Sequence, residues 1–425
     1  MLARIATKRH KRALTIFLRV VLVLLCDNGF VMLCRVNRRR LMIVAGEPSG
    51  DAHAAALVNA LRDQPPVSEF EIFGATGPLL RAAGVRSVIN TDELAILGIL
   101  EVTRALPKFL DVFRKLKQVA LEMKPDAVVL VDWPEFNLRL ATALHKRGLK
   151  VIYYISPQLW AWRPRRINTI KRDVDLLLSI LPFEQEWFKA RGVDQVEFVG
   201  HPLAGEVRPR FGREEFCRRN DLDASRPIVS FLPGSRHKEL QRILPPMLGA
   251  IEKLSVIRPD VQCVVVVAPS RSIPETQQIV TQQNGSHSIK LVQGETREAL
   301  AASDAAAIAS GTATLEAALL ETPMVVVYKE SAMNWHTLGR LITVSHYGLV
   351  NLVAGKEIAR ELMQNDLTGE NLSAELLKLL EPSANANARK ELAEVAHRLG
   401  DAGASERAAK VIMEFLASQS PLRVA

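Results

Sequence analysis

Residues 310–319 read SGTATLEAAL and follow directly on the apolar run AAAIA at 305–309. The apolar run is typical of a buried strand, and a helical pattern begins inside the stretch that follows it. The first three residues of that stretch would then lie at a strand-to-helix turn, where free backbone N–H groups and the helix dipole favour an anion. Glu316, one turn into the helix, is placed to accept hydrogen bonds from a ribose diol. The stretch therefore predicts either a phosphate-binding turn or an ordinary capped helix behind a core strand.

The composition bounds the class of protein. A chain of 425 residues has room for two or three domains, and its 48% of hydrophobic residues is ample for their cores. The net charge of +9 is concentrated at the start, because residues 1–40 carry ten Lys and Arg and one acid, Asp27, whereas the rest carries 45 of each sign. The high isoelectric point therefore describes the extension and gives no ground for a nucleic-acid partner.

The first forty residues are unusual. A mostly apolar run, Ala13–Cys26, is interrupted by Arg19 and flanked by basic residues. It is shorter than the roughly 20 residues of a membrane span. It resembles a signal peptide but has no clear small-x-small cleavage site. We favour a start-site artefact, with the true start near Met42, or a loose membrane anchor over export.

The cysteines argue against a cross-linked or zinc-binding protein. There are four, widely spaced, with no CxxC pair and no Cys/His cluster: Cys26, Cys34, Cys217 and Cys263. This spacing predicts neither a disulfide framework nor a zinc site, and it fits a reducing cytosol.

The body begins with an α/β unit. The apolar run 41–45 is typical of a buried parallel strand, GEPSGD at 46–51 of a turn, and the alanine-rich residues from 52 of a helix. His53, in the first turn of that helix, is either a surface residue or a polar group that faces an interdomain cleft. Further strands are expected at 71–74, 126–131, 150–155, 176–180 and 196–199.

Polar residues follow the ends of these strands. Ligands bind outside the carboxyl ends of strands in open α/β sheets, and five polar residues lie at or just after such ends: Asp132, Asn137, Ser156, Gln158 and His201. Asp132 ends a buried apolar strand, where burial can raise the pKa of a carboxyl group toward the range of a general base. The alternative is that Asp132 caps a helix or forms a turn.

Two further segments suggest contact with lipid or a ring system. Leu94–Leu100 is apolar and is followed by a basic, helix-like stretch to residue 119. This order suits an anionic membrane surface or a lipid chain, although a buried loop and an ordinary amphipathic helix would give the same pattern. The cluster Trp160–Arg166 could stack a base, meet lipid head groups or form a half-buried loop.

A second α/β half starts at Pro227, after a charged linker at about 203–226. Its first strand, 228–232, leads into PGSR at 233–236, where Arg236 could grip a pyrophosphate bidentately. Further strands are expected at 262–268, 287–292, 304–309 and 324–328. Two candidate phosphate turns together with Glu316 favour a nucleotide-diphosphate site in this half.

From about Leu41 onward the chain resembles lipid-A-disaccharide synthase, a family of bacterial glycosyltransferases. The resemblance rests on motifs that recur in order over nearly all of 41–380: AGEPSGD at 45–51, VD at 131–132 with FN at 136–137, SPQ at 156–158 with WAW at 160–162, GHP at 200–202, LPGSR at 232–236, SGTATLE at 310–316 and NL at 351–352. The first forty residues fall outside it, which supports a misplaced start or an optional anchor.

The resemblance implies an α/β fold of the GT-B type, two Rossmann-like domains that face each other across a cleft. We expect the extension at 1–40, an acceptor and lipid domain at 41–205, a UDP-sugar domain at 206–395, and a C-terminal helix at 396–425 that packs on the first domain or on a partner. The implied reaction is an inverting transfer from UDP-2,3-diacylglucosamine to 2,3-diacylglucosamine 1-phosphate in lipid A biosynthesis. It would occur on the cytoplasmic face of the inner membrane.

The resemblance also implies roles for residues. Asp132 would be the base, assisted by Glu47 or His53. UDP would be held by Gly234, Ser235, Arg236, Ser310, Gly311, Thr312 and Glu316, with Asn351 on a loop that closes the cleft. The acceptor and its acyl chains would contact Ser49, Asn137, Gln158, Leu97, Ile99 and Leu100. Such a fold can work without a metal, no DxD motif is apparent, and we expect no metal and no cofactor.

Two alternatives stay open. A UDP-sugar epimerase or a peptidoglycan glycosyltransferase of the same fold would share the UDP half but not the apolar and basic surface near 94–118. A non-catalytic nucleotide-sugar sensor would keep its ligand response without Asp132. The sequence leaves a homodimer open.

Overall fold

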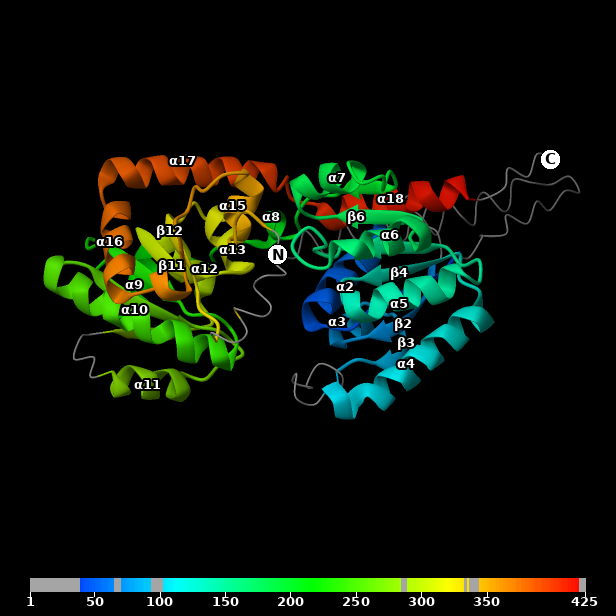
Figure 1. Ribbon diagram of the computed structural model, residues 1–425, viewed down its shortest axis with the longest axis horizontal. Helices are drawn as coiled ribbons and strands as arrows, with labels where there is room; N and C mark the ends of the chain where they lie inside the picture. Colours follow the sequence, from blue (N-terminus) through cyan, green and yellow to red (C-terminus); the bar gives the residue numbers. More distant parts are fainter. Residues whose placement is uncertain are drawn as a thin grey trace, which may run out of the picture. The chain divides into compact units, whose positions relative to one another are not determined.

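The computed structural model describes residues 39–64, 70–92, 102–283, 289–331, 335 and 344–419, of which 102–106 are described by their backbone alone. The predictions for residues 1–38 and for Leu97, Ile99 and Leu100 lie outside these ranges. The described chain carries two parallel β-sheets, one in each half (Figure 1).

The first sheet has the strand order β3-β2-β1-β4-β5-β6-β7. Its strands are β1 (Arg39–Ala45), β2 (Phe70–Thr76), β3 (Arg86–Asn90), β4 (Ala127–Val131), β5 (Val151–Tyr154), β6 (Leu176–Ser179) and β7 (Val196–Phe198). The second sheet has the order β10-β9-β8-β11-β12-β13. Its strands are β8 (Ile228–Leu232), β9 (Gln262–Val267), β10 (Lys290–Gln293), β11 (Ala305–Ala309), β12 (Met324–Tyr328) and β13 (Glu361–Met363).

Helices connect successive strands, as parallel pairing requires. Those of the first half are α2 (Pro48–Asp63), α3 (Pro78–Ala82), α4 (Val102–Met123), α5 (Pro134–His145), η2 (Pro164–Arg166), α6 (Ile167–Asp173), α7 (Pro182–Lys189) and α8 (Leu203–Glu206). Those that follow are α9 (Arg213–Arg219), α10 (His237–Ile257), α11 (Ile273–Gln282), α12 (Thr296–Ala302), α13 (Ala313–Leu319), α15 (Leu349–Ala354), η4 (Gln364–Asp366), α16 (Gly369–Leu379), α17 (Pro382–Arg398) and α18 (Ala404–Ser418).

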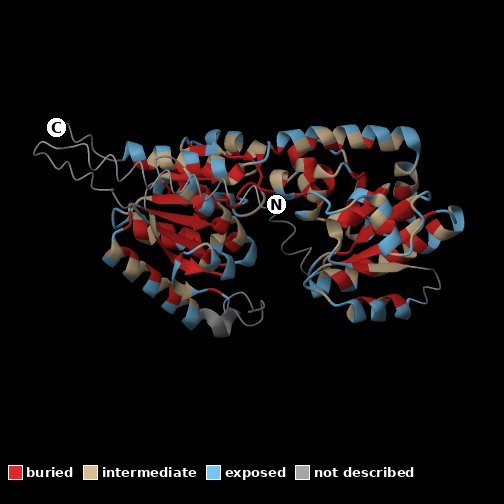
Figure 2. Cartoon of the chain, turned by 180° about the vertical axis from the view of Figure 1, so that it is seen from behind, coloured by how far each residue is buried: buried red, intermediate tan, exposed pale blue. Residues whose placement is uncertain are grey.

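Each sheet is buried on both faces, which explains its continuous apolar strands. Along β1, Leu41 and Ile43 pack with α2 and α18, whereas Met42 and Val44 point to the opposite face and pack with α4 and α5. Figure 2 shows the same layering, with buried strands between helices whose outer faces are exposed. The predicted α/β class with two parallel sheets is therefore confirmed.

The chain order places the catalytic candidates at the switch point of each sheet. In the first sheet β1 pairs with both β2 and β4, so the chain leaves in opposite directions from β1 and β4 and opens a crevice beyond their carboxyl ends. Glu47 follows β1 and Asp132 follows β4. In the second sheet β8 and β11 pair in the same way, and Arg236 and Ser310 follow them.

The last helix returns to the first sheet. Ala408, Ile412 and Leu416 of α18 belong to the hydrophobic cluster that α2 forms over β1. The Arg407 guanidinium donates to the carbonyl oxygen of Val199 at 2.8 Å and to that of Asp401 at 2.7 Å. Of the two partners that the sequence allowed for this helix, the structure shows the first domain. None of the described helices is long and apolar enough to span a membrane.

Candidate active site

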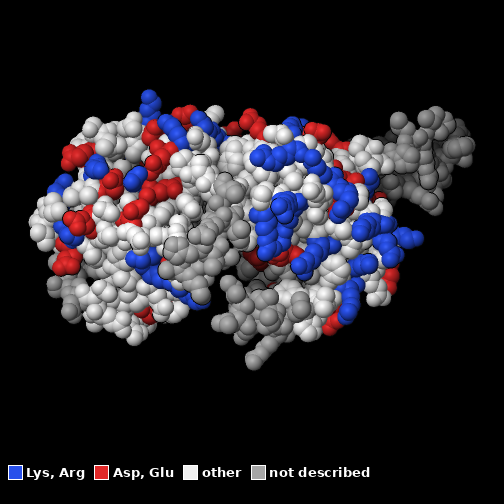
Figure 3. Space-filling view, viewed as in Figure 1, with Lys and Arg blue, Asp and Glu red and all other residues white. Residues whose placement is uncertain are grey.

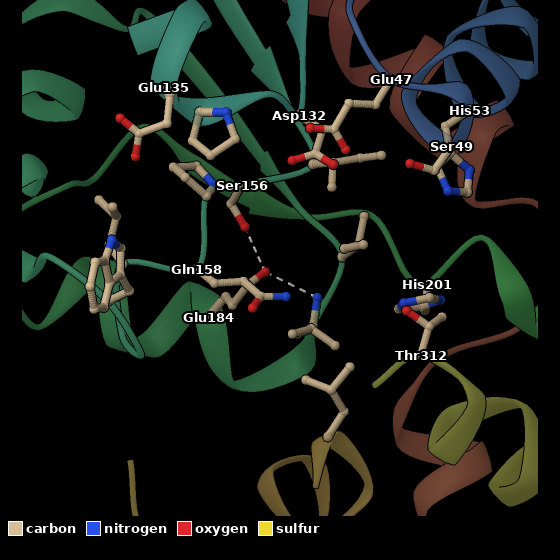
Figure 4. Close-up of a pocket in the computed structure, with 18 of the residues that line it drawn as sticks. Glu47, Ser49, His53, Asp132, Glu135, Ser156, Gln158, Glu184, His201 and Thr312 are labelled. Carbon is tan, nitrogen blue, oxygen red and sulfur yellow. Dashed lines mark hydrogen bonds between the residues drawn. The ribbon is translucent and has the colours of Figure 1, made fainter. Parts of the chain in front are cut away.

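One cavity at the strand ends draws on both halves of the chain, and it is larger than the cavity of the phosphate turns described below. It has a volume of about 570 Å³. The first half supplies, among others, Glu47, Ser49, His53, Asp132, Glu135, Ser156, Gln158, Trp162, Arg166, Glu184 and His201, and the second half supplies Arg236, Thr312 and Leu349. Figure 4 shows many of these side chains. Both candidate assistants of Asp132, Glu47 and His53, therefore share its cavity.

Asp132 lies on a strained turn. Asp132 and Trp133 have positive φ angles of 49° and 51°, a left-handed conformation that costs residues with a side chain on the order of 1–3 kcal/mol each. Three contacts hold the turn: the Asp132 carbonyl oxygen accepts from Tyr153 Oη at 2.7 Å and from Asn137 Nδ2 at 2.8 Å, and its N–H donates to Tyr154 O at 3.0 Å. The carboxylate is thus aimed by its backbone.

The environment tunes this carboxyl group for proton transfer. Burial, and secondarily the negative charge of Glu47, raise the pKa of Asp132 to about 6, against the opposing hydrogen bond from the Trp133 N–H. A carboxyl group with that pKa is largely ionised at neutral pH and is a stronger base than an ordinary aspartate. Burial lowers the pKa of His53, partly offset by the charge of Glu206, so the imidazole is neutral at the same pH.

The second cavity, of about 420 Å³, joins the two predicted phosphate turns. Its lining includes Gly234, Ser235 and Arg236 from the first turn and Ser310, Gly311, Thr312 and Glu316 from the second. Arg236 and Thr312 line both cavities. The pattern that suggested one nucleotide-diphosphate site therefore corresponds to one hollow, which is continuous in its lining with the cavity of Asp132.

Acidic and basic side chains in this hollow already pair with each other. The Arg236 side chain is 81% exposed and contacts Glu239 at 3.0 Å, while the Glu239 carboxylate also accepts from the N–H groups of Ser235 and Arg236 at 3.1 Å. Glu316 accepts from Arg297 Nε at 3.2 Å. An anionic ligand would therefore contact the exposed guanidinium of Arg236. It would compete with the Glu239 carboxylate for that guanidinium and for the backbone N–H groups of the turn.

Two sequence predictions need correction. Asn351 lies on helix α15 and not on a loop, it is fully buried, and its amide is used internally by Ala359, Glu361 and Ile358. Asn137 is also fully buried and donates to Val131 O and Asp132 O, so it braces the strained turn. Neither residue lines either cavity. Both predictions took a polar residue of a motif for one that faces ligand.

Other functional candidates were missed. Glu184 lies in the first turn of α7, after the end of β6, and is 1% exposed. It accepts from Ser156 Oγ at 2.6 Å (Figure 4) and from Trp160 Nε1 at 3.0 Å. Burial raises its pKa to about 7 despite these hydrogen bonds. Glu184 thereby holds the loop that carries Gln158 and Trp162 into the cavity. Its place just after a buried strand was the available signal.

Two further residues of the cavity, Arg166 and Glu135, form an ion pair. Arg166 donates to Glu135 Oε1 at 2.7 Å and to Oε2 at 2.5 Å, in a bidentate arrangement. The guanidinium of Arg166 lowers the pKa of Glu135.

Among the residues that the structure describes, no group of three His, Cys, Asp or Glu side chains is placed to hold a metal ion.

Comparison with known proteins assigns the family. A family model described as lipid-A-disaccharide synthetase matches residues 41–415. The chain belongs to this family, which consists of glycosyltransferases. The lipid-A-disaccharide synthase of Solibacter usitatus is 42% identical over 382 residues, which is 89% of this chain and 98% of that protein. The synthase of Myxococcus xanthus is 41% identical, with the same coverage of both chains. The resemblance seen in the sequence is therefore confirmed.

Solved structures confirm the GT-B fold. The sucrose-phosphate synthase of Thermosynechococcus elongatus has a TM-score of 0.58 at 14% identity and covers 90% of this chain and 100% of its own. The UDP-GlcNAc 2-epimerase of Neisseria meningitidis bound to UDP-GlcNAc has a TM-score of 0.57 at 11% identity, again with 90% and 100% covered. At these identities the likeness concerns the fold alone.

Proposed function

We propose that this lipid-A-disaccharide synthase family member transfers the sugar of UDP-2,3-diacylglucosamine to the 6-hydroxyl of 2,3-diacylglucosamine 1-phosphate, with inversion. The products would be the β-1,6-linked disaccharide 1-phosphate and UDP. The observation that carries the proposal is the shared lining of the two cavities by Arg236 and Thr312. It puts a candidate base and a candidate diphosphate site within reach of one donor sugar.

The transfer is a single displacement, in which the acceptor attacks the anomeric carbon as UDP leaves. Asp132 takes the proton of the 6-hydroxyl as its oxygen attacks the anomeric carbon, which needs an ionised carboxylate in a partly dehydrated cavity. Burial and the charge of Glu47 supply the raised pKa of about 6. Glu47 and His53 assist by electrostatics and by contact with the acceptor, and Ser49 and Gln158 line the same cavity.

UDP departs in the same displacement. As the bond from the anomeric carbon to the diphosphate oxygen breaks, negative charge grows on the diphosphate. Arg236 and the backbone N–H groups at Gly311 and Thr312 would stabilise that charge. Glu316 would bind the ribose hydroxyls in the smaller cavity, where it competes with its contact to Arg297.

A basic face supports a role at an anionic membrane surface. Figure 3 shows Lys and Arg side chains gathered over α5 and α6, and exposed members include Arg139, Arg163, Arg165, Lys171 and Arg172. Arg166, in the cavity next to them, is held by Glu135. We propose that this face holds the protein on the cytoplasmic face of the inner membrane, where lipid substrates enter the cavity.

The test is a disaccharide assay in mixed micelles with wild type and Asp132→Asn. We expect loss of turnover by about 10²- to 10⁴-fold with UDP affinity unchanged, because Asn keeps the shape of the side chain and removes the base. Asp221→Asn is the control, since the Asp221 side chain is 88% exposed and lines neither cavity. Full activity of Asp132→Asn would exclude Asp132 as the base. If the wild type binds UDP but forms no disaccharide, the proposed acceptor is wrong, and UDP-sugar epimerisation would then be measured.

A further inference from the structure

His201 is a buried polar residue of the larger cavity that has no part in the mechanism above. It follows β7 at the turn Gly200–Pro202, is 7% exposed, and lines the cavity together with Arg236 and Thr312. Its backbone N–H donates to Leu399 O at 2.8 Å, which ties the turn to the end of α17. The backbone of His201 is therefore fixed by the residue that follows α17.

The surroundings fix the tautomer of this imidazole. The backbone N–H of Leu203, which can only donate, contacts His201 Nδ1 at 3.2 Å. Nδ1 must accept that hydrogen bond, so the ring proton of the neutral imidazole is on Nε2. Burial, and then the neighbouring His53, lower the pKa of His201 to about 4, so the ring is neutral at physiological pH. His201 is thus a fixed, neutral Nε2–H donor.

This donor has no acceptor in the described part of the chain. Among the hydrogen bonds between described residues, the only one that the ring makes is the bond that Nδ1 accepts. The Nε2 atom is not among the described side-chain polar atoms that are buried without a partner, so it is open to the cavity, where a ligand can supply its acceptor. The cavity is the place from which that acceptor must come.

The position of His201 narrows the identity of the acceptor. Helix α8, which begins two residues after His201, packs against α13, the helix that follows Thr312. His201 and Thr312 both line the larger cavity, and in Figure 4 they overlap in projection. Arg236 and Thr312 are also the residues common to the two cavities. A ligand atom at that junction would belong to the diphosphate of the donor.

We propose that His201 donates its Nε2–H to a phosphoryl oxygen of the bound nucleoside diphosphate sugar and strengthens this hydrogen bond as the diphosphate leaves. The proposal rests on the proposed function for the location of the diphosphate. His201 transfers no proton: the bond between the anomeric carbon and the leaving oxygen breaks, its electron pair stays on UDP, and the acceptor proton goes to Asp132. A neutral donor stabilises the growing charge without becoming an acid.

The experiment separates the two nitrogens of the ring in the full-length protein. In His201→Asn, the side-chain oxygen takes the place of Nδ1 and can still accept from Leu203, but the cavity donor is lost. In His201→Gln, the amide nitrogen takes the place of Nε2 and the donor is kept, while the bond from Leu203 is lost. His397→Asn, at an exposed histidine of α17, is the matched control. UDP affinity by calorimetry, kcat and the KM for the acceptor are measured for each.

Loss of the donor should lower UDP affinity and kcat by about 10- to 100-fold in His201→Asn, with a smaller loss in His201→Gln and none in His397→Asn. The reverse order, an active His201→Asn and an impaired His201→Gln, would show that His201 only braces the turn and would overturn the proposal. A rise confined to the acceptor KM would also overturn it. If the wild type binds UDP but forms no disaccharide, the proposed function fails while the UDP affinities of the variants still decide the role of His201.

Discussion

The raised pKa of Asp132 gives a quantitative expectation for the pH dependence of the reaction. A base with a pKa of about 6 is about nine-tenths ionised at pH 7 and about one-tenth ionised at pH 5. Because only the ionised form accepts the proton, kcat/KM should fall by about tenfold between pH 7 and pH 5. An aspartate at its ordinary value, 3.8, would lose less than about a tenth of its activity over the same range.

The wild-type profile does not by itself identify the titrating group, because the acceptor phosphate has a second pKa near 6. Glu47→Gln removes this ambiguity. The charge of Glu47 is one of the two causes that raise the pKa of Asp132. Its removal should therefore move the acid limb, the part of the profile in which kcat/KM falls toward low pH, to lower pH. The limb should stay above 3.8, because burial, the larger cause, remains. The phosphate titrates alike with both enzymes.

The assay is kcat/KM for disaccharide formation from pH 5 to pH 8 with wild type, Glu47→Gln and Glu122→Gln. Glu122 is an exposed residue of α4, so its variant removes one negative charge without changing the cavity. We expect Glu47→Gln to keep a larger share of its own pH 7 activity at pH 5 than either other protein. An acid limb at the same pH in all three would refute the assignment of the limb to Asp132.

Two further predictions concern stability. The pKa of Glu184 rises from 4.5 to about 7 on folding, so the native state binds the proton more tightly and wild-type stability falls as pH rises through this window. Urea unfolding should show that the wild type loses about 2–3 kcal/mol of stability between pH 5 and pH 8 relative to Glu184→Gln, which has no carboxyl group to titrate at this position. Parallel pH dependences of the two proteins would contradict this. Arg407→Ala removes the hydrogen bond to Val199 that docks α18 on the first half, together with the local bond to Asp401 in the turn before the helix. We expect the variant to exchange its amides in α18 faster than the wild type does, with α10 as the reference helix that does not change. Equal protection of α18 in the variant and the wild type would argue against this docking role.

The sequence was informative where local pattern decides the outcome. Apolar runs without alternation correctly predicted β4, β8 and β11, because a strand buried on both faces needs no polar side. The rule that ligands bind beyond the carboxyl ends of parallel strands then singled out Asp132 and Arg236. These residues are about a hundred positions apart in the sequence, and both line the larger cavity. The pairing of the two turns in one cavity follows from β8 and β11 being neighbours.

The sequence failed where a polar side chain had two possible directions. An amide in a motif has the same letters whether it faces a ligand or the protein, and only the partners that it meets in the folded chain decide. Asn137 meets the carbonyl oxygens of a turn five and six residues back. Glu184 meets Ser156, 28 residues earlier, beyond the ends of the neighbouring strands β6 and β5. No local periodicity carries that information.

The hydrogen bonds around Asn351 show how such a residue can still serve the site. Its Nδ2 donates to Glu361 at 2.8 Å, and the same carboxylate accepts from the N–H groups of Tyr347 at 2.9 Å and Gly348 at 2.8 Å. The carbonyl oxygen of Tyr347 accepts in turn from Ser310 Oγ at 2.7 Å. A continuous chain of hydrogen bonds therefore joins the buried amide to the first residue of the phosphate turn. Because the atoms of this chain pair with one another inside the protein, the chain can fix the turn before a ligand arrives. The groups left with spare donors, Arg236 and His201, remain to meet the ligand.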